Sequence, residues 1–321
     1  TLNDVYYQNV AYTESGKTLA DETGLYWDNR PMYERVTKGL PFNEIYVLKN
    51  TNKGYTYSLS LKADKSFACG LDLSASYTFT QSKSISSATS SQAQSNWRNT
   101  QTYRFSNSPE LSYSAYNIPH MIKASAFYHF NIANNKMFTT TIGIIYQGRS
   151  GSPYSLMYNG DINGDSGTSN DLVYIPTDEQ IDQMPFKGTD AYPADLQRQN
   201  LKAWLAKTPY LKDHRGQYYK RNADNLPFEH HFDLHVAEKM SLKVGKYVHA
   251  LELSLDILNV ANMINKDWGR TYGTNYSNEL ILPLTYDGGQ YQFVSSPDYI
   301  LKYPQSYYSR WRGQLGLKYT F

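Results

Sequence analysis

Apolar and polar residues alternate along several stretches of the chain. In Tyr55–Lys62 every odd position is apolar and every even position is polar, and Cys69–Thr80 repeats the pattern. Successive side chains of a β-strand point to opposite faces, so this alternation predicts strands with one apolar and one polar face. The same pattern recurs at residues 122–130, 138–146, 232–236, 251–257 and 311–321.

Several of these stretches are longer than the five or six residues typical of soluble sheets. They match the roughly 9 to 11 residues that a tilted strand needs to cross a bilayer. Glu252, Asp256, Arg310 and Arg312 share the polar face, where charge is tolerable only against water. The sequence therefore predicts an all-β, antiparallel transmembrane β-barrel whose polar side chains face the lumen, with the two arginines paired to Asp256 or Glu252. A soluble β-sandwich with one wet face is the alternative.

The connections between the predicted strands alternate between short and long. Short turns are expected near Asp64–Ala68, Ile132–Lys136 and Leu242–Tyr247, and long connections over Gln81–Asn117, Gly148–Glu229 and Val260–Ser306. Short turns at one rim and long loops at the other are typical of outer-membrane barrels. A strand near Asp4–Thr13 and another that begins near Glu44 bring the expected number to about eight. A capping box at Thr177 and the proline Pro193 predict short helices inside the longest connection.

Composition narrows the functional classes. The 321 residues carry a net charge of +2, which gives no footprint for nucleic acid, and 15% are aromatic, which argues against disorder. A single cysteine excludes a disulfide within the chain, and no apolar run is long enough for a membrane-spanning helix. The first residues do not form a signal peptide, so we expect a mature or truncated piece.

Three regions resemble a known family. The terminal stretch, with Trp311, Leu315, Leu317, Tyr319 and Phe321, resembles the signal that the barrel-assembly machinery recognises in outer-membrane proteins. Leu251–Gly269 resembles the penultimate-strand motif of TonB-dependent outer-membrane transporters. Segments of the longest connection resemble the Oar-like branch of Bacteroidetes-type bacteria, which is related to SusC-like transporters: Gly151–Ser155, Asp161–Asp165, Asn170–Pro176, Arg215-Gly216 and Arg221-Asn222.

The resemblance implies a fold and a function. Such transporters have a plug domain inside a 22-stranded barrel, so residues 1–321 are expected to be the C-terminal portion of the barrel, about eight strands with long extracellular loops and short helices, without the plug. The implied activity is TonB-dependent transport of a peptide, protein or glycan across the bacterial outer membrane. The implied partners are outer-membrane lipid, the barrel-assembly machinery, the TonB complex through the missing plug, and a surface lipoprotein lid. A passive porin or a structural eight-stranded barrel is the alternative.

Candidate ligand contacts are aromatic pairs in the loops. These are Tyr26, Trp27, Tyr218, Tyr219, Tyr307 and Tyr308, whose rings suit sugars or peptide side chains, although girdle or loop packing also explains them. No catalytic motif is found, so no enzymatic activity is expected.

Two sets of residues have the composition of metal ligands. Asp161, Asn163, Asp165 and Asp171 provide oxygen atoms at spacings that suit calcium in an extracellular loop, but Leu172 stands where a calcium loop needs glutamate, and a turn rich in Asn, Asp and Gly is the simpler interpretation. His231, Asp233 and His235 share one strand face, for which polar lumen residues are the favoured account. No cofactor is required.

Overall fold

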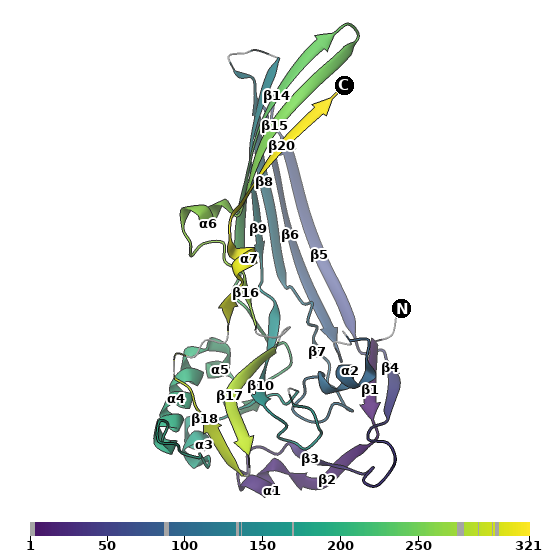
Figure 1. The fold of residues 1–321 in the computed structure, drawn as a ribbon, viewed down its shortest axis with the longest axis vertical. Helices are drawn as coiled ribbons and strands as arrows, with labels where there is room; N and C mark the ends of the chain where they lie inside the picture. The colour runs from purple at the N-terminus through teal and green to yellow at the C-terminus, as the bar shows by residue number, and fades with distance from the viewer. Residues whose placement is uncertain are drawn as a thin grey trace.

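The computed structural model contains one large antiparallel sheet and a separate packed unit at one end of it (Figure 1). It describes residues 4–86, 90–132, 135, 137–168, 170–274, 279–287, 289–296, 298 and 302–321. Seven long strands form the sheet in the order β20-β15-β14-β9-β8-β6-β5, and the short β7 pairs with β6. Their bounds are β5 Tyr55–Ser66, β6 Leu71–Ser84, β7 Ser112–Tyr113, β8 His120–Phe130, β9 Phe138–Arg149, β14 Glu229–Val244, β15 Tyr247–Leu258 and β20 Arg312–Thr320. The predicted antiparallel strands are confirmed.

The register aligns like residues across the sheet. One row of directly paired positions is wholly apolar: Leu71, Tyr128, Ile142, Val236, Leu255 and Leu315. The neighbouring row, which points to the opposite face, runs from Asp72 through Phe127, Gly143, His235 and Asp256 to Gln314. Because the alternation stays in phase over six strands, the sheet has one apolar face and one mainly polar face, as the sequence predicts.

Short and long connections lie at opposite ends of the strands. The β14–β15 hairpin closes through Gly245 and Lys246, and the C-terminus lies at this turn end (Figure 1). The expected turn at Ile132–Lys136 includes residues 133, 134 and 136, which lie outside the described residues. The long connections meet at the other end, so the alternation of loop lengths is confirmed.

The sheet does not close into a barrel. Strands β5 and β20 are its two edges, and each pairs on one side only within the residues that the structure describes. All six pairings between the seven long strands are antiparallel, so β5 and β20 run in the same direction. Joining these two edges directly would create a parallel pair.

The prediction of a barrel strand near Asp4–Thr13 is wrong. Strand β1 (Asp4–Asn9) instead pairs with β4 (Tyr46–Thr51) in a separate two-stranded sheet, and β2 (Tyr12–Thr18) pairs with β3 (Pro31–Arg35). Tyr7 and Tyr12 pack against a small core made of Tyr33, Trp97 and Phe105. Tyr7 and Tyr12 are therefore partly buried against loop residues rather than against lipid.

The long connections fold into a packed unit, here called the loop unit: the described residues of segments 4–51, 90–113, 150–228 and 279–296. Besides β1 to β4 it contains α1 Leu19–Thr23, α2 Ala93–Arg98, β10 Pro153–Asn159, β11 Tyr174–Ile175, α3 Asp178–Gln183, α4 Ala194–Lys207, α5 Pro209–Asp213, β12 Gln217–Tyr218, β13 Asp224–Asn225, β17 Glu279–Asp287 and β18 Gln290–Phe293. Strand β10 pairs with both β13 and β17, and the core around it includes Leu156, Met157, Trp204 and Phe293.

Smaller elements lie in the connection between β15 and β20. They are α6 Val260–Ile264, β16 Tyr272–Gly273, β19 Tyr303–Pro304 and α7 Ser306–Ser309, and α6, β16 and α7 are labelled in Figure 1. No helix in the described part of the chain has the length and apolar character needed to span a bilayer.

Candidate ligand-binding pocket

The loop unit contains a pocket of about 620 Å³. This volume lies within the roughly 300–1,000 Å³ range of ligand sites. Its walls come from the end of β6, the segment after α2, strand β7 and the segment around β12, and Leu172 also lines it. These segments are far apart in the sequence, so the pocket exists only because the long connections pack together.

Four tyrosines line the pocket: Tyr103, Tyr113, Tyr218 and the almost fully buried Tyr219. The rings of Tyr103 and Tyr218 stack with centroids 4.3 Å apart. Tyr103 donates a hydrogen bond from its hydroxyl to Glu110 Oε1 at 2.9 Å, and Tyr218 donates to Asp28 Oδ1 at 2.8 Å. Burial, together with these carboxylates, raises the pKa of both tyrosines, so both hydroxyls stay protonated and keep the rings in place.

The wall that carries Tyr113 is attached to the β12 segment by buried polar contacts. Arg221 Nη1 donates to the backbone oxygen of Ile85 at 2.7 Å, and its other terminal nitrogen donates to Ser84. Ser112 Oγ donates to the backbone oxygen of Arg221 at 2.6 Å, and Asn222 Nδ2 donates to that of Tyr113 at 2.8 Å. The pocket is therefore built before any ligand arrives, which lowers the entropic cost of binding.

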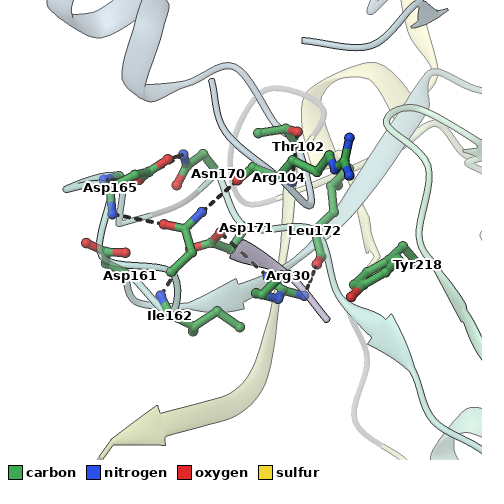
Figure 2. A network of polar contacts seen from close by, with 12 residues as sticks. Arg30, Thr102, Arg104, Asp161, Ile162, Asp165, Asn170, Asp171, Leu172 and Tyr218 are labelled. Atoms are coloured by element: carbon green, nitrogen blue, oxygen red, sulfur yellow. Dashed lines mark hydrogen bonds and ion pairs between the residues drawn. The ribbon is translucent and has the colours of Figure 1, made fainter. Parts of the chain in front are cut away.

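A buried arginine lies behind Tyr218 (Figure 2). Arg30 is fully buried, donates from Nε to Asp28 Oδ1 at 3.1 Å, and donates from Nη2 to the backbone oxygen of Leu172 at 2.9 Å. Its Nη1 lies 3.6 Å from Asp171 Oδ1, and its guanidinium lies 5.6 Å from the centre of the Tyr218 ring. Burial alone would lower the pKa of Arg30, but the Asp28 and Asp171 carboxylates raise it, so Arg30 stays charged. Arg30 thereby links both the Leu172 wall and Tyr218 to the N-terminal segment.

The four residues of the calcium hypothesis belong to the loop that precedes Leu172, and Asp171 of this set contacts Arg30. Asp161 accepts hydrogen bonds from the backbone of Gly164 and Ser166, Asn163 from Asp165, and Asp171 from Ile162. These are the contacts of an Asx-rich turn. Among the described residues, no group of three or more His, Cys, Asp or Glu side chains is arranged to hold a metal ion. Calcium binding stays a prediction of the sequence, and a change in thermal stability on adding calcium would test it.

Burial affects the ionisation of two of these carboxyl groups. Burial and the nearby Asp161 carboxylate raise the pKa of Asp165 to about 7. Burial and Asp165 also raise the pKa of Asp171, against the opposing effect of Arg30.

Comparison with known proteins identifies the family. Residues 2–279 match the family model described as an outer membrane beta barrel domain. The chain belongs to this outer-membrane β-barrel family. No curated protein and no solved structure matches the chain.

Membership places the protein in the bacterial outer membrane as an integral protein, as the sequence predicts. It also agrees with the apolar face of the sheet, which lipid would cover. The finer assignment to TonB-dependent transporters remains a proposal.

The aromatic candidates lie in different places in this barrel-family protein. Tyr218 and Tyr219 both line the pocket, although Tyr219 is only 1% exposed and also packs in the core of the loop unit. Tyr26 and Trp27 pack edge to face, 5.0 Å apart, and Tyr26 is largely exposed. The Tyr307 and Tyr308 rings are exposed in α7. The structure therefore does not bring the three pairs together, and of the six candidates Tyr218 and Tyr219 line the pocket.

On the polar face of the sheet, Asp256, Glu252 and Arg312 have other partners than the expected ones. His235 Nδ1 lies 2.6 Å from Asp256 Oδ1, Glu252 lies opposite Lys318, and Arg312 donates to the Tyr307 hydroxyl at 3.1 Å. Arg312 is in register with Leu258, so it does not lie opposite Asp256. Within the described residues, neither Arg310 nor Arg312 forms a salt bridge with Asp256 or Glu252.

His231, Asp233 and His235 each have a different partner: His231 contacts Thr271, Asp233 accepts from the Asn259 backbone, and His235 pairs with Asp256. This agrees with the structural interpretation of these residues.

The residues of the assembly signal share one face of the edge strand. Trp311, Leu315, Leu317, Tyr319 and Phe321 are all exposed. The described residues leave this row exposed, which suits contact with lipid.

Sequence reasoning missed most of the pocket. No sequence motif marks Lys83, Tyr103, Tyr113 or Lys220. Arg30 donates to the backbone oxygen of Leu172, which is 142 positions away in the sequence. Two signals pointed to the pocket: the pair Tyr218-Tyr219, and the family-like motifs, since Ser155 of one motif accepts a hydrogen bond from the Asn222 backbone of another at 2.9 Å.

Proposed function

We propose that this chain forms part of the wall and outer loops of a TonB-dependent transporter that imports a ligand across the outer membrane. Membership of the outer-membrane barrel family and the motifs at Leu251–Gly269 and in the longest connection support this proposal. In it, the polar sheet face lines the lumen, the apolar face contacts lipid, and the loop unit lies outside the cell.

The open sheet carries the proposal. Unpaired backbone groups at β5 and β20 would each cost several kcal/mol in hydrocarbon. Direct closure would need a parallel pair, whereas bacterial single-chain barrels consist of an even number of antiparallel strands. Further strands between β5 and β20, from residues outside this sequence, satisfy both conditions and fit a larger barrel.

The proposed mechanism assigns separate tasks to separate parts. The loop unit binds the ligand, the barrel wall surrounds the plug, and the TonB complex pulls on the plug so that a path opens. The chain's own residues bind and guide the ligand, and none performs covalent chemistry.

The alternative is a passive porin or a small structural barrel. In the part of the chain that the structure describes, the sheet has seven long strands, and this odd number disfavours a small barrel made of this chain alone. A porin predicts a permanently open lumen, whereas a plugged transporter predicts a closed one.

Two measurements on the full-length protein test the proposal. The purified periplasmic domain of TonB should bind the full-length protein, and liposomes containing the protein should resist swelling in raffinose. Rapid swelling together with no TonB binding would overturn the proposal in favour of a porin. A matched protein without its plug should swell, which verifies that the barrels are inserted.

A further inference from the structure

The pocket of the loop unit has an excess of positive charge. Lys83, Lys220 and Arg221 line it, against the single carboxylate of Glu110. The Arg221 guanidinium is buried and donates to backbone oxygens, but neither lysine ammonium is held by such hydrogen bonds within the described residues. In the described residues, the lysines that form salt bridges are Lys62, Lys202 and Lys207, so both pocket lysines lack a carboxylate partner.

One of these lysines lies against an aromatic ring. Lys83 Nζ is 5.2 Å from the centre of the Tyr113 ring. The Tyr103 and Tyr218 rings form a second aromatic surface in the same pocket, and their hydroxyls are occupied by Glu110 and Asp28. The rings therefore offer apolar faces to a ligand, close to two ammonium groups that can pair with an anion.

We propose that this pocket binds an acidic oligosaccharide, with a uronate carboxylate held by Lys83 and Lys220 and a sugar ring packed on a tyrosine face. The proposal rests on the proposed transport function and names its ligand class. A pyranose has an apolar C–H face and a polar rim, which suit tyrosine rings beside charged and amide side chains such as Gln217.

A peptide fits this pocket less well. The aliphatic lining of the pocket is confined to Leu111, Leu172 and Ala223, which leaves little surface for the apolar side chains of a peptide. Recognition by strand addition needs an exposed sheet edge. The local strands β7 and β12 are only two residues long, and each already pairs with a neighbour.

Calorimetric titration of the full-length protein in detergent tests the inference. The probes are trigalacturonate, its neutral methyl ester and triaspartate. Trigalacturonate should bind, and the ester and triaspartate should each bind at least about tenfold more weakly. The Lys83→Gln and Lys220→Gln variants should each lose about tenfold in affinity, as expected for losing a hydrogen bond to a charged group.

Lys246→Gln is the matched control. Lys246 also lies over a tyrosine, with Nζ 5.5 Å from the Tyr247 ring, but at the opposite end of the strands. Its substitution should leave the affinity unchanged, which separates the pocket from a general loss of positive charge.

Three results would overturn the inference: no binding of trigalacturonate, equally tight binding of triaspartate, or unchanged affinity in both lysine variants. If TonB binding and the closed lumen persist in the same preparation, the ligand assignment fails and the transport proposal stands. If TonB binding and the closed lumen are absent while trigalacturonate binds at the lysines, the transport proposal fails and the ligand assignment stands.

Discussion

Arginine substitutions at three successive positions of β15 test which face of the sheet contacts lipid. Leu255 lies opposite Val236 and Leu315, in the middle of the apolar row. Ser254 points to the other face, between Ala237 and Gly316. Leu253 shares the apolar face but lies opposite Glu238.

The expected loss of folding free energy on substitution by arginine differs between these three positions. An arginine at the bilayer midplane of a barrel costs about 2–4 kcal/mol, which corresponds to roughly 30- to 1,000-fold in an equilibrium constant. We expect this cost for Leu255→Arg. Ser254→Arg should cost within about 0.5 kcal/mol, because its side chain enters water beside small neighbours.

Leu253→Arg should fall between them because of Glu238. This carboxyl accepts a hydrogen bond from Thr140 at 2.5 Å through Oε2, and its Oε1 is buried with no hydrogen-bond partner among the described residues. An arginine directly opposite would supply the missing donor. Opposite charges facing each other across strands contribute about 0.2–1 kcal/mol, so the Leu253→Arg penalty should be reduced by at least this amount.

Urea unfolding of the full-length protein from phosphatidylcholine vesicles measures the cost, and gel mobility with and without heating measures assembly in cells. The double variant Glu238→Gln/Leu253→Arg should restore the full penalty seen for Leu255→Arg. If Ser254→Arg is as damaging as Leu255→Arg, the assignment of the two faces is wrong.

The remaining predictions concern the loop unit and the polar face. Arg30→Met should destabilise the loop unit by about 3–5 kcal/mol, since Asp28 and Asp171 would become unpaired buried carboxyls; tryptophan fluorescence during heating measures this. Because Asp165 has a raised folded pKa of about 7 against about 3.9 when unfolded, its contribution to stability is lost as the pH rises through 7. The melting temperature should therefore be higher at pH 5 than at pH 8, and Asp165→Asn should flatten this dependence. Gly143→Leu should cost about 1–3 kcal/mol, because a Cβ there would lie 2.3 Å from the Phe127 ring, and Phe127→Ala should rescue assembly; unchanged assembly of Gly143→Leu would refute the close packing.

The long strands were predictable because alternation of side chains is a direct consequence of strand geometry. Leu71, Leu73 and Tyr77 needed no distant information to be placed on one face. The capping box at Thr177 was equally local: the Gln180 backbone donates to Thr177 Oγ1 and the Gln180 side chain accepts from the Thr177 backbone, so α3 begins as expected.

Alternation alone did not show what covers the apolar face. Tyr7 and Tyr12 lie in strands, as Tyr55 and Tyr57 do, yet they pack against Trp97 and Phe105 instead of pointing to lipid. The difference lies in distant residues that close over β1 and β2, which no local pattern encodes. The expected arginine pairing is not seen for a similar reason: the register of β20 places Gln314 opposite Asp256, and His235 Nδ1 lies 2.6 Å from Asp256 Oδ1.

The pocket follows from long-range contacts that make the long connections behave as one body. Arg30 joins the N-terminal segment to Leu172, and Arg221 joins the β12 segment to the end of β6. Because both guanidinium groups are buried, separating these segments would expose them or leave their partners unpaired, at a cost far above thermal energy. A ligand that enters the pocket therefore contacts a wall fixed to strand β6 of the membrane sheet. Movement of the loop unit, in the proposed transport cycle, has to occur as a whole against the sheet rather than loop by loop.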